Sequence, residues 1–181
     1  MEETLRKIVK RLAIDLGDEF DRNFERQKFF TEPWQRRKSP VRSEGRAILT
    51  DTSQLRRSIK KQVAGDAVSF TSDLPYAAIH NEGGEIVVTE KMRRFFWRKH
   101  YEATGSFGRK KDGSRRNNAA NRRLSTEAEF WRALALKKAG SVIKIPRRRF
   151  IGYHAEIDKI IQNAIDATLP ADVVAKLTPE K

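Results

Sequence analysis

A long apolar stripe near the N-terminus is the feature that most restricts how this chain can fold. Its members recur mostly three or four residues apart, at Leu5, Ile8, Val9, Leu12, Leu16, Phe20 and Phe24. This spacing places them on one face of a helix over residues about 3–29, with Lys, Arg, Asp and Glu on the other face. We expect the charged face to be solvated and the apolar face to pack against a sheet.

Four later segments have the alternating pattern that is typical of β-strands. They lie near residues 58–64, 67–72, 85–89 and 141–145. Gly65-Asp66 between the first two favours a tight hairpin turn, and Pro146 ends the fourth. A last helix is expected at about 154–169. The pattern predicts a single α+β domain over residues 1–181, in which a mainly antiparallel four-stranded sheet packs against the long N-terminal and C-terminal helices.

The apolar positions of these elements predict the buried core. We expect the following residues to be mostly buried: Leu12, Leu16, Phe20, Trp34, Leu55, Ile59, Phe70, Tyr76, Ile79, Phe150, Ile157 and Ile161. Trp34 is the one large apolar residue of a polar loop at 31–47, which favours a plug for this core over a ligand platform.

Residues about 90–140 form a basic insertion between the third and fourth strands. Lys91 to Arg123 contains twelve Lys or Arg residues and two acidic ones, so +10 of the chain's net charge of +14 lies in this run. Both ends of the insertion have a helical pattern and are expected to pair as a hairpin. The aromatic residues expected to pack them together are Phe95, Phe96, Trp97, Phe130 and Trp131. The polar centre, 105–123, has little to bury and is expected to be mobile.

This insertion supplies the candidate contacts for a polyanion. They are Arg93, Arg94, Arg98, Lys99, Arg109, Lys110, Lys111, Arg115, Arg116, Arg122 and Arg123. Such an excess of positive charge favours DNA or an acidic protein surface as the partner. The sequence leans towards DNA contact without sequence readout, because no folded element for reading a groove is apparent.

No pattern in the sequence indicates catalysis. There is no cysteine, and the three histidines at positions 80, 100 and 154 share no helical spacing that would hold a metal. His80 and Glu82 could be drawn as an acid–base pair, but residues two apart on a helix do not face each other. The N-terminus lacks the apolar core of a signal peptide, and no run is apolar enough to span a membrane. We therefore expect no enzyme, metal, cofactor or membrane contact.

The segment LPYAAIHNEGG at residues 74–84 is interpreted as a structural corner. Pro75 suits the first turn of a short helix, whose apolar side would pack against the sheet. Gly83 and Gly84 would then supply the positive φ angle that a chain needs when it leaves a helix and turns into a strand.

The order of these motifs resembles the phage virion morphogenesis family, the neck and tail-completion proteins typified by Mu-like phages. Members carry a leucine before an Asp/Thr/Gly-type turn and Leu-x-x-Ser, then Tyr-Ala-x-x-His-x-x-Gly-Gly, then Ile-Pro-x-Arg-x-Phe before a helix. The matching residues, with the loop tryptophan, are Trp34, Leu49, Asp51, Leu55, Ser58, Tyr76, His80, Gly83, Gly84, Pro146, Arg148 and Phe150. Ser53 stands where a glycine is common, and the insertion at 90–140 is much longer than the minimal family pattern.

The resemblance implies a small structural subunit that acts as a ring or collar component joining head and tail. Its partners would be other neck, head-completion and tail proteins of the virion. It would be a monomer or weak oligomer when free and a ring in the particle, present in the bacterial host cytoplasm during assembly and then in the virion. The alternative is a stand-alone nucleic-acid-binding protein that uses residues 91–123 without sequence preference.

Overall fold

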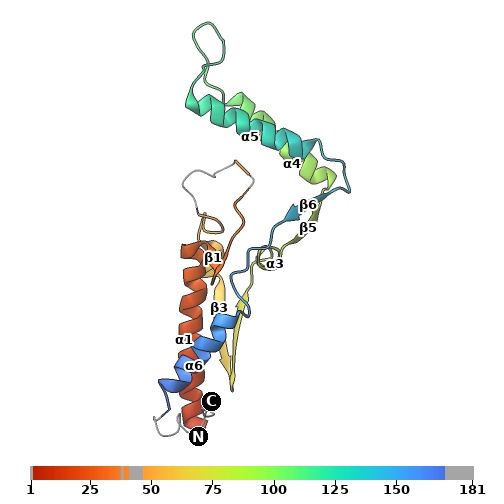
Figure 1. Cartoon of the computed structure of the whole chain (residues 1–181). Helices are drawn as coiled ribbons and strands as arrows, with labels where there is room; N and C mark the ends of the chain where they lie inside the picture. The colour runs from red at the N-terminus through yellow and green to blue at the C-terminus, as the bar shows by residue number, and fades with distance from the viewer. Residues whose placement is uncertain (1, 38, 41–46, 170–181) are drawn as a thin grey trace. The chain divides into compact units, whose positions relative to one another are not determined.

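The apolar stripe near the N-terminus forms a long helix, α1, Glu2–Arg26. The computed structural model describes residues 2–37, 39–40 and 47–169, and Figure 1 labels its elements. The buried positions of α1 are Val9, Ala13, Leu16, Phe20, Asn23 and Phe24, which follow the predicted helical spacing. Gln27 takes a positive φ of 56° directly after the helix, so α1 ends at Arg26 and not near residue 29.

The chain forms two compact units. The first unit consists of Met1–Gln35, Ala47–Gly83 and Arg147–Lys181, and the second of Arg36–Arg46 and Gly84–Pro146. The chain therefore enters the second unit at Gly84 and returns to the first at Arg147. The second unit contains the whole predicted insertion together with the third and fourth predicted strands.

In the first unit, a β-hairpin and the last helix pack against α1. Strands β3 (Ile59–Ala64) and β4 (Ala67–Ser72) are antiparallel and are joined by the predicted two-residue turn. Helix α6 (Ala155–Asp166) covers another part of α1. The unit's short elements are β1 (Lys28–Phe29), which pairs with β2 (Glu32–Pro33), and the helices α2 (Gln54–Arg57) and α3 (Ala77–Glu82).

Two clusters of buried side chains form the interior of the first unit. One groups Leu16, Phe20, Phe29, Phe30 and Ile157, and the other groups Phe24, Trp34, Leu55, Ala77 and Phe150. The predicted core residues that are buried are Leu16, Phe20, Trp34, Leu55, Phe150 and Ile157. Those that are half-buried are Leu12, Ile59, Phe70 and Ile79.

The prediction of burial was wrong for Tyr76 and Ile161, which are exposed. Tyr76 precedes the first residue of α3, so its side chain is outside the face that this short helix buries. Helix α6 is narrow in its burial: Ile157 and Ala164, seven residues apart, are its buried positions, and Ile161 lies beside that line.

In the second unit, two helices pack side by side and continue from a short strand pair (Figure 1). Helix α4 (Glu90–Gly105) begins after Thr89, whose side chain accepts a hydrogen bond from the Met92 backbone N–H at 3.2 Å. Helix α5 (Ala119–Ala135) begins after Asn118, which caps it in the same way. Strands β5 (Gly84–Val87) and β6 (Val142–Ile145) pair in antiparallel fashion. The predicted helical hairpin is therefore confirmed.

The predicted four-stranded sheet was wrong. The described residues contain three separate two-stranded sheets, β1–β2, β3–β4 and β5–β6. All four predicted strands exist and their pairs are antiparallel, but the two pairs belong to different compact units. Alternation identifies a strand without identifying its neighbour, and between β4 and β5 the chain forms α3 in place of a turn that would bring the two strands together.

Residues 105–123, expected to be mobile, form a hydrogen-bonded loop and the first turn of α5. The side chain of Asn121, only 2% exposed, bonds to the backbone N–H and carbonyl oxygen of Gly108, both at 2.8 Å, and to the carbonyl oxygen of Arg116 at 2.6 Å. The expectation rested on the lack of apolar residues. A buried amide orders this polar loop in their place.

Candidate functional site

Three family-motif residues of the first unit, Trp34, Leu55 and the fully buried Phe150, belong to one buried cluster. The ring of Phe150 lies 5.3 Å from the ring of Phe24, which in turn meets Trp34 edge-on at 5.5 Å between centroids. The indole Nε1 of Trp34 donates a hydrogen bond to the carbonyl oxygen of Arg149 at 2.6 Å, so this polar atom is satisfied inside the core.

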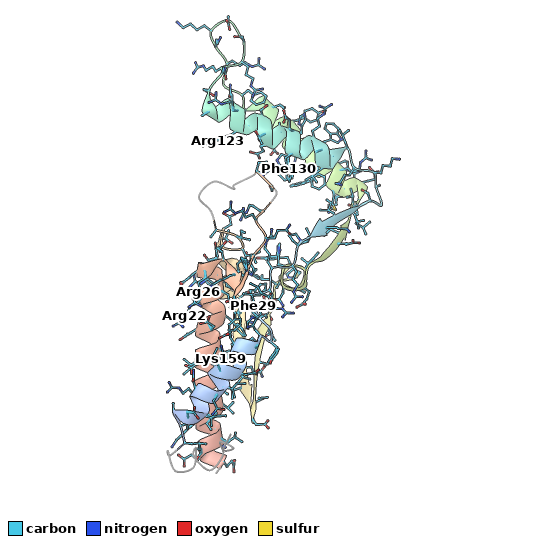
Figure 2. The ribbon with its side chains drawn as sticks, viewed as in Figure 1. Arg22, Arg26, Phe29, Arg123, Phe130 and Lys159 are labelled. Atoms are coloured by element: carbon cyan, nitrogen blue, oxygen red, sulfur yellow. The ribbon has the colours of Figure 1, made fainter. Side chains whose placement is uncertain are left out.

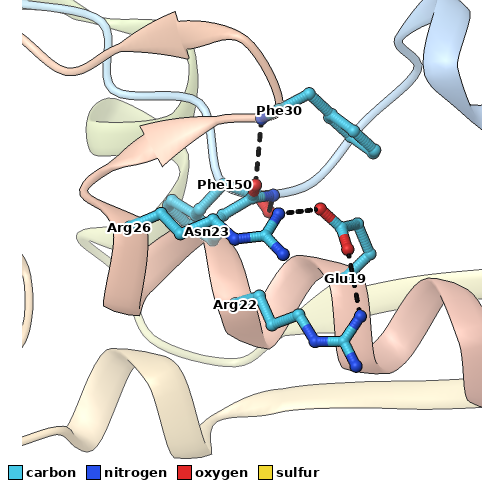
Figure 3. Close-up of polar contacts among 6 residues, drawn as sticks. All are labelled: Glu19, Arg22, Asn23, Arg26, Phe30 and Phe150. Atoms are coloured by element: carbon cyan, nitrogen blue, oxygen red, sulfur yellow. Dashed lines mark hydrogen bonds and ion pairs between the residues drawn. The ribbon is translucent and has the colours of Figure 1, made fainter.

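Two buried asparagines hold the backbone of Phe150. The side-chain oxygen of Asn81 accepts hydrogen bonds from the backbone N–H groups of Phe150 at 2.9 Å and Ile151 at 3.1 Å. From α1, Asn23 donates to the carbonyl oxygen of Phe150 at 3.5 Å and accepts from the N–H of Phe30 at 3.0 Å (Figure 3). Because a buried amide without partners is costly, these bonds restrict where the Phe150 segment can lie.

Sequence reasoning missed both asparagines, although one of them gave a signal. Asn23 stands within the apolar stripe, beside Phe24 and three residues after Phe20. A polar residue at a buried helical position needs a hydrogen-bond partner, so its place in the stripe marks a tertiary contact. Asn81 gave no such signal, because it lies in the six-residue helix α3, which is too short to show an apolar stripe.

Arg148 is buried beside His80, where the chain returns to the first unit. Its backbone N–H donates to the carbonyl oxygen of His80 at 2.8 Å, and its Nε donates to the carbonyl oxygen of Gln35 at 2.9 Å. Burial lowers the pKa of His80, and the positive charge of Arg148 lowers it further, so the imidazole is neutral at pH 7. The contacts of both motif residues, His80 and Arg148, therefore lie inside the fold.

The motif turn before α2 contains two non-glycine residues in the left-handed region. Leu49 has a φ of 62° and Ser53 a φ of 54°. Ser53 occupies the position before the helix without making a side-chain cap to it. The glycine that is common in the family at this position would adopt the same φ without strain. Asp51 lies exposed in this turn.

Helix α2 is fastened on both sides by polar contacts. The guanidinium of Arg56 donates to Asp21 and to Glu25 of α1, and these hydrogen bonds raise the pKa of Arg56. After α2, the hydroxyls of the motif residue Ser58 and of Ser72 share a hydrogen bond at 2.7 Å, which ties the helix end to the last residue of β4.

The glycine pair after α3 serves one close backbone approach. Gly83 has a φ of 75°, and a Cβ there would lie 2.9 Å from the backbone nitrogen of Arg147, so no other residue fits without a shift. Gly84 does not take a positive φ and opens strand β5, opposite Ile145. Pro146 directly follows β6.

The remaining motif residue, Tyr76, is 38% exposed and touches the His80 ring edge-on at 6.2 Å. The motif residues thus form the packing and corners of the first unit and its junctions with the second.

Trp131 packs against aromatic side chains of the other helix of the second unit, whereas Tyr101 is 65% exposed. Trp131 of α5 lies 6.0 Å from Phe95 and 5.9 Å from Phe96 of α4. Trp97 stacks on Tyr101 within α4 at 5.8 Å. The predicted packing of the hairpin through these rings is confirmed for Trp131 with Phe95 and Phe96, and Phe96, only 8% exposed, is not a free platform for stacking bases.

Basic side chains of α4 have acidic neighbours on the same helix. Arg93 pairs with Glu90 at 2.8 Å, and Glu102 pairs with Lys99 at 2.6 Å and with Arg98 at 3.5 Å. The hydrogen bond from Lys99 lowers the pKa of Glu102, so this carboxylate stays ionised. Part of the positive charge of α4 is therefore neutralised within the helix.

The loop between α4 and α5, residues 106–118 and called the tip loop, has a different charge environment. Its one carboxylate, Asp112, accepts hydrogen bonds from the hydroxyl of Ser114 at 2.6 Å and from its N–H at 2.8 Å, and these lower the pKa of Asp112. Arg115 lies over the Phe107 ring, 3.7 Å from its centroid, and donates to the carbonyl oxygen of Asn121.

The other basic residues of the tip loop face solvent. Arg109 donates to the carbonyl oxygen of Gly113 at 3.0 Å, and Arg116 donates to that of Arg109 at 2.8 Å. Lys110 and Lys111 make no side-chain hydrogen bond or ion pair within the described part of the chain. The further exposed candidates on the helices are Arg94, Arg122 and Arg123, the last of which lies on α5 near the tip loop in Figure 2.

No group of three His, Cys, Asp or Glu residues within residues 2–37, 39–40 and 47–169 could hold a metal ion. None of the helices in those ranges is long and apolar enough to cross a membrane.

Comparison with known proteins agrees with the motifs. No curated protein and no solved structure matches the chain. A sequence model of the phage virion morphogenesis family matches residues 2–170, which include every described residue. The chain therefore belongs to the phage virion morphogenesis family.

Proposed function

We propose that this chain is a structural subunit at the neck of a phage or prophage particle, where it acts as a ring or collar component that completes the tail and joins it to the head. Membership of the virion morphogenesis family is the observation that carries the proposal. The use of the motif residues inside the fold supports it, because they build a scaffold and leave contact surfaces, not a reactive cluster, as the means of action.

In this proposal the partners are other neck, head-completion and tail proteins. The free chain is a monomer or weak oligomer, because a net charge of +14 disfavours self-association in dilute solution. The ring closes when neighbouring virion proteins are present. The chain is made in the host cytoplasm and ends in the virion.

Deletion of the chain's gene from the phage or prophage that encodes it tests this role. Electron micrographs of the lysate should show filled heads and complete tails that are not joined, and supplying the wild-type chain from a plasmid should restore joined particles. Joined, infectious particles in the absence of the chain would contradict the proposal.

The purified chain gives a second test. Native mass spectrometry and negative-stain images should show monomers or weak oligomers at micromolar concentration. A stable dimer that buries a large apolar interface would count against a ring that needs its neighbours.

The alternative, a stand-alone nucleic-acid-binding protein, differs in the same deletion experiment. A stand-alone binder would leave the joining of heads and tails intact. Its support is the charge of the second unit, which is also compatible with the assembly role.

A further inference from the structure

The tip loop is a turn closed by hydrogen bonds. Arg109 and Arg115 form an isolated antiparallel bridge, and within it Lys110 N–H donates to the carbonyl oxygen of Ser114 at 2.7 Å. Gly113 reverses the chain at a φ of 81°. Asn121 closes the base of the loop through its bonds to Gly108 and to Arg116. The basic side chains therefore start from a defined backbone.

The arginines of the tip loop bond to backbone carbonyl oxygens, whereas several arginines elsewhere in the described chain pair with carboxylates. On α1, Arg22 and Arg26 both contact Glu19, at 3.4 and 2.6 Å (Figure 3). In the tip loop the arginines bond to backbone carbonyl oxygens, which leaves their positive charge in place. The acidic residue within the turn, Asp112, is held by Ser114.

The tip loop also has no exposed apolar residue to act as the centre of a protein interface. Its one aromatic side chain, Phe107, is half-buried and covered by the guanidinium of Arg115. Protein interfaces usually depend on aromatic or aliphatic side chains at their centre, whereas contact with nucleic acid phosphates needs only Lys, Arg and backbone donors. The composition of the surface therefore fits a phosphate backbone better than an acidic protein.

The position of the loop agrees with such a contact. Within the second unit it lies at the end of the α4–α5 hairpin that is farthest from β5 and β6 (Figure 1). A turn that presents Arg109, Lys110, Lys111 and Arg116 can contact successive phosphates of a nucleic acid backbone. It offers no helix or strand pair of a length that could read base edges in the major groove.

We propose that the tip loop binds the phosphate backbone of duplex DNA without sequence preference. The helices of the hairpin then hold the loop at the end of the second unit that is farthest from β5 and β6, and the rings of Phe96 and Trp131 pack the hairpin. This DNA contact is separate from the proposed ring or collar role and can fail or hold independently of it.

The test is a titration of the full-length chain with a fluorescent duplex, followed by anisotropy from about 50 to 200 mM salt. Each phosphate contact contributes about 0.9 to the slope of log K against log salt. Lys110→Gln with Lys111→Gln should lower the slope by up to about 1.8, since each lysine lost removes at most one contact. Neither side chain makes a bond that the loop needs, so the variant keeps its fold.

Lys137→Gln with Lys138→Gln is the matched control. It removes the same charge from two adjacent lysines of the same unit, outside the tip loop. This control should keep the wild-type slope. Replacing Arg109, Lys110, Lys111, Arg115 and Arg116 together by Ser should abolish most of the binding, with circular dichroism confirming that the helices remain.

Several results would overturn the proposal. One is a wild-type chain that does not bind duplex at 50 mM salt, and another is an equal loss of affinity in the tip and control variants. Unchanged DNA binding in the tip variant, together with failed joining of heads and tails, would assign the loop to an acidic protein partner. A wild-type affinity that depends on duplex sequence would also contradict it.

Discussion

The two units of this chain use the same chemical device, a buried asparagine, for different ends. In the first unit Asn23 and Asn81 bond to the backbone around Phe150 and lock a core segment in place. In the second unit Asn121 bonds to the backbone of a loop whose residues are almost all exposed. The buried asparagines of the first unit stabilise a scaffold, and that of the second holds a charged surface in a fixed shape.

The arginines of the two units also differ in the partners that they contact. Some arginines of the first unit, such as Arg56 with Asp21 and Glu25, reach acidic partners on α1, whereas others, such as Arg57, bond to backbone carbonyl oxygens. The arginines of the tip loop bond to carbonyl oxygens and stay uncompensated. The family-motif residues lie in the first unit, except for Gly84 and Pro146 at its junctions with the second. A change in the first unit should therefore alter folding, and a change in the tip loop should alter binding.

The largest expected effect is on the core of the first unit. Phe150→Ala removes a ring that is 0% exposed and should lower the free energy of unfolding by about 3–5 kcal/mol, measured by urea denaturation. Tyr101→Ala in the second unit, at a side chain that is 65% exposed, should cost less than about 0.5 kcal/mol. Similar losses of stability for the two variants would contradict the assignment of the core to the first unit.

A matched pair of asparagine variants separates the stability of the core from the order of the tip loop. Asn81→Ala strands the N–H groups of Phe150 and Ile151 in the interior and should cost about 1–3 kcal/mol of global stability. Asn121→Ala should leave the global unfolding free energy nearly unchanged and speed hydrogen exchange at residues 108–116. It should also weaken duplex binding although no charge is lost, because the loop is no longer preorganised.

The outcome of these two variants would be read together. If Asn121→Ala unfolds the whole chain, the tip loop is part of one cooperative structure and the division of roles fails. If Asn121→Ala leaves exchange within the loop unchanged, other contacts order it, and the assignment to Asn121 is wrong.

The sequence predicted the individual elements well, because each depends on a local pattern. The stripe of α1 and the turn between β3 and β4 were both visible as spacings within a few residues. The pairing of strands was not visible, since nothing local in β5 tells whether β4 or β6 is its neighbour. The predicted burial of Trp34 and Phe150 is confirmed, and it follows from their size and apolar surroundings.

The order of the tip loop was not visible in the sequence for a related reason. Its composition is that of a disordered segment, and one amide, Asn121, supplies the bonds that close it. Nothing near Asn121 distinguishes it from Asn117 or Asn118 in the same polar run. Tertiary hydrogen bonds of this kind depend on which side chain the fold happens to enclose.

The smallest expected effect comes from exchanging serine and glycine between the two units. Ser53 in the first unit has a left-handed φ of 54°; its hydroxyl and N–H make only long hydrogen bonds to Thr50, at 3.5 and 3.3 Å, and a glycine would keep the bond that its carbonyl oxygen accepts from the Arg57 N–H. Ser53→Gly removes backbone strain at the cost of some chain entropy, so it should raise the free energy of unfolding by about 0.5–1 kcal/mol. The converse change, Gly113→Ser, places a Cβ where nothing lies within 4 Å, so its cost comes from the φ of 81° alone. It should loosen the exchange protection of the tip loop without lowering the melting temperature. Thermal unfolding and hydrogen exchange of the two variants measure both effects. If Gly113→Ser lowers the melting temperature by more than Ser53→Gly raises it, strain in the tip loop reaches the core.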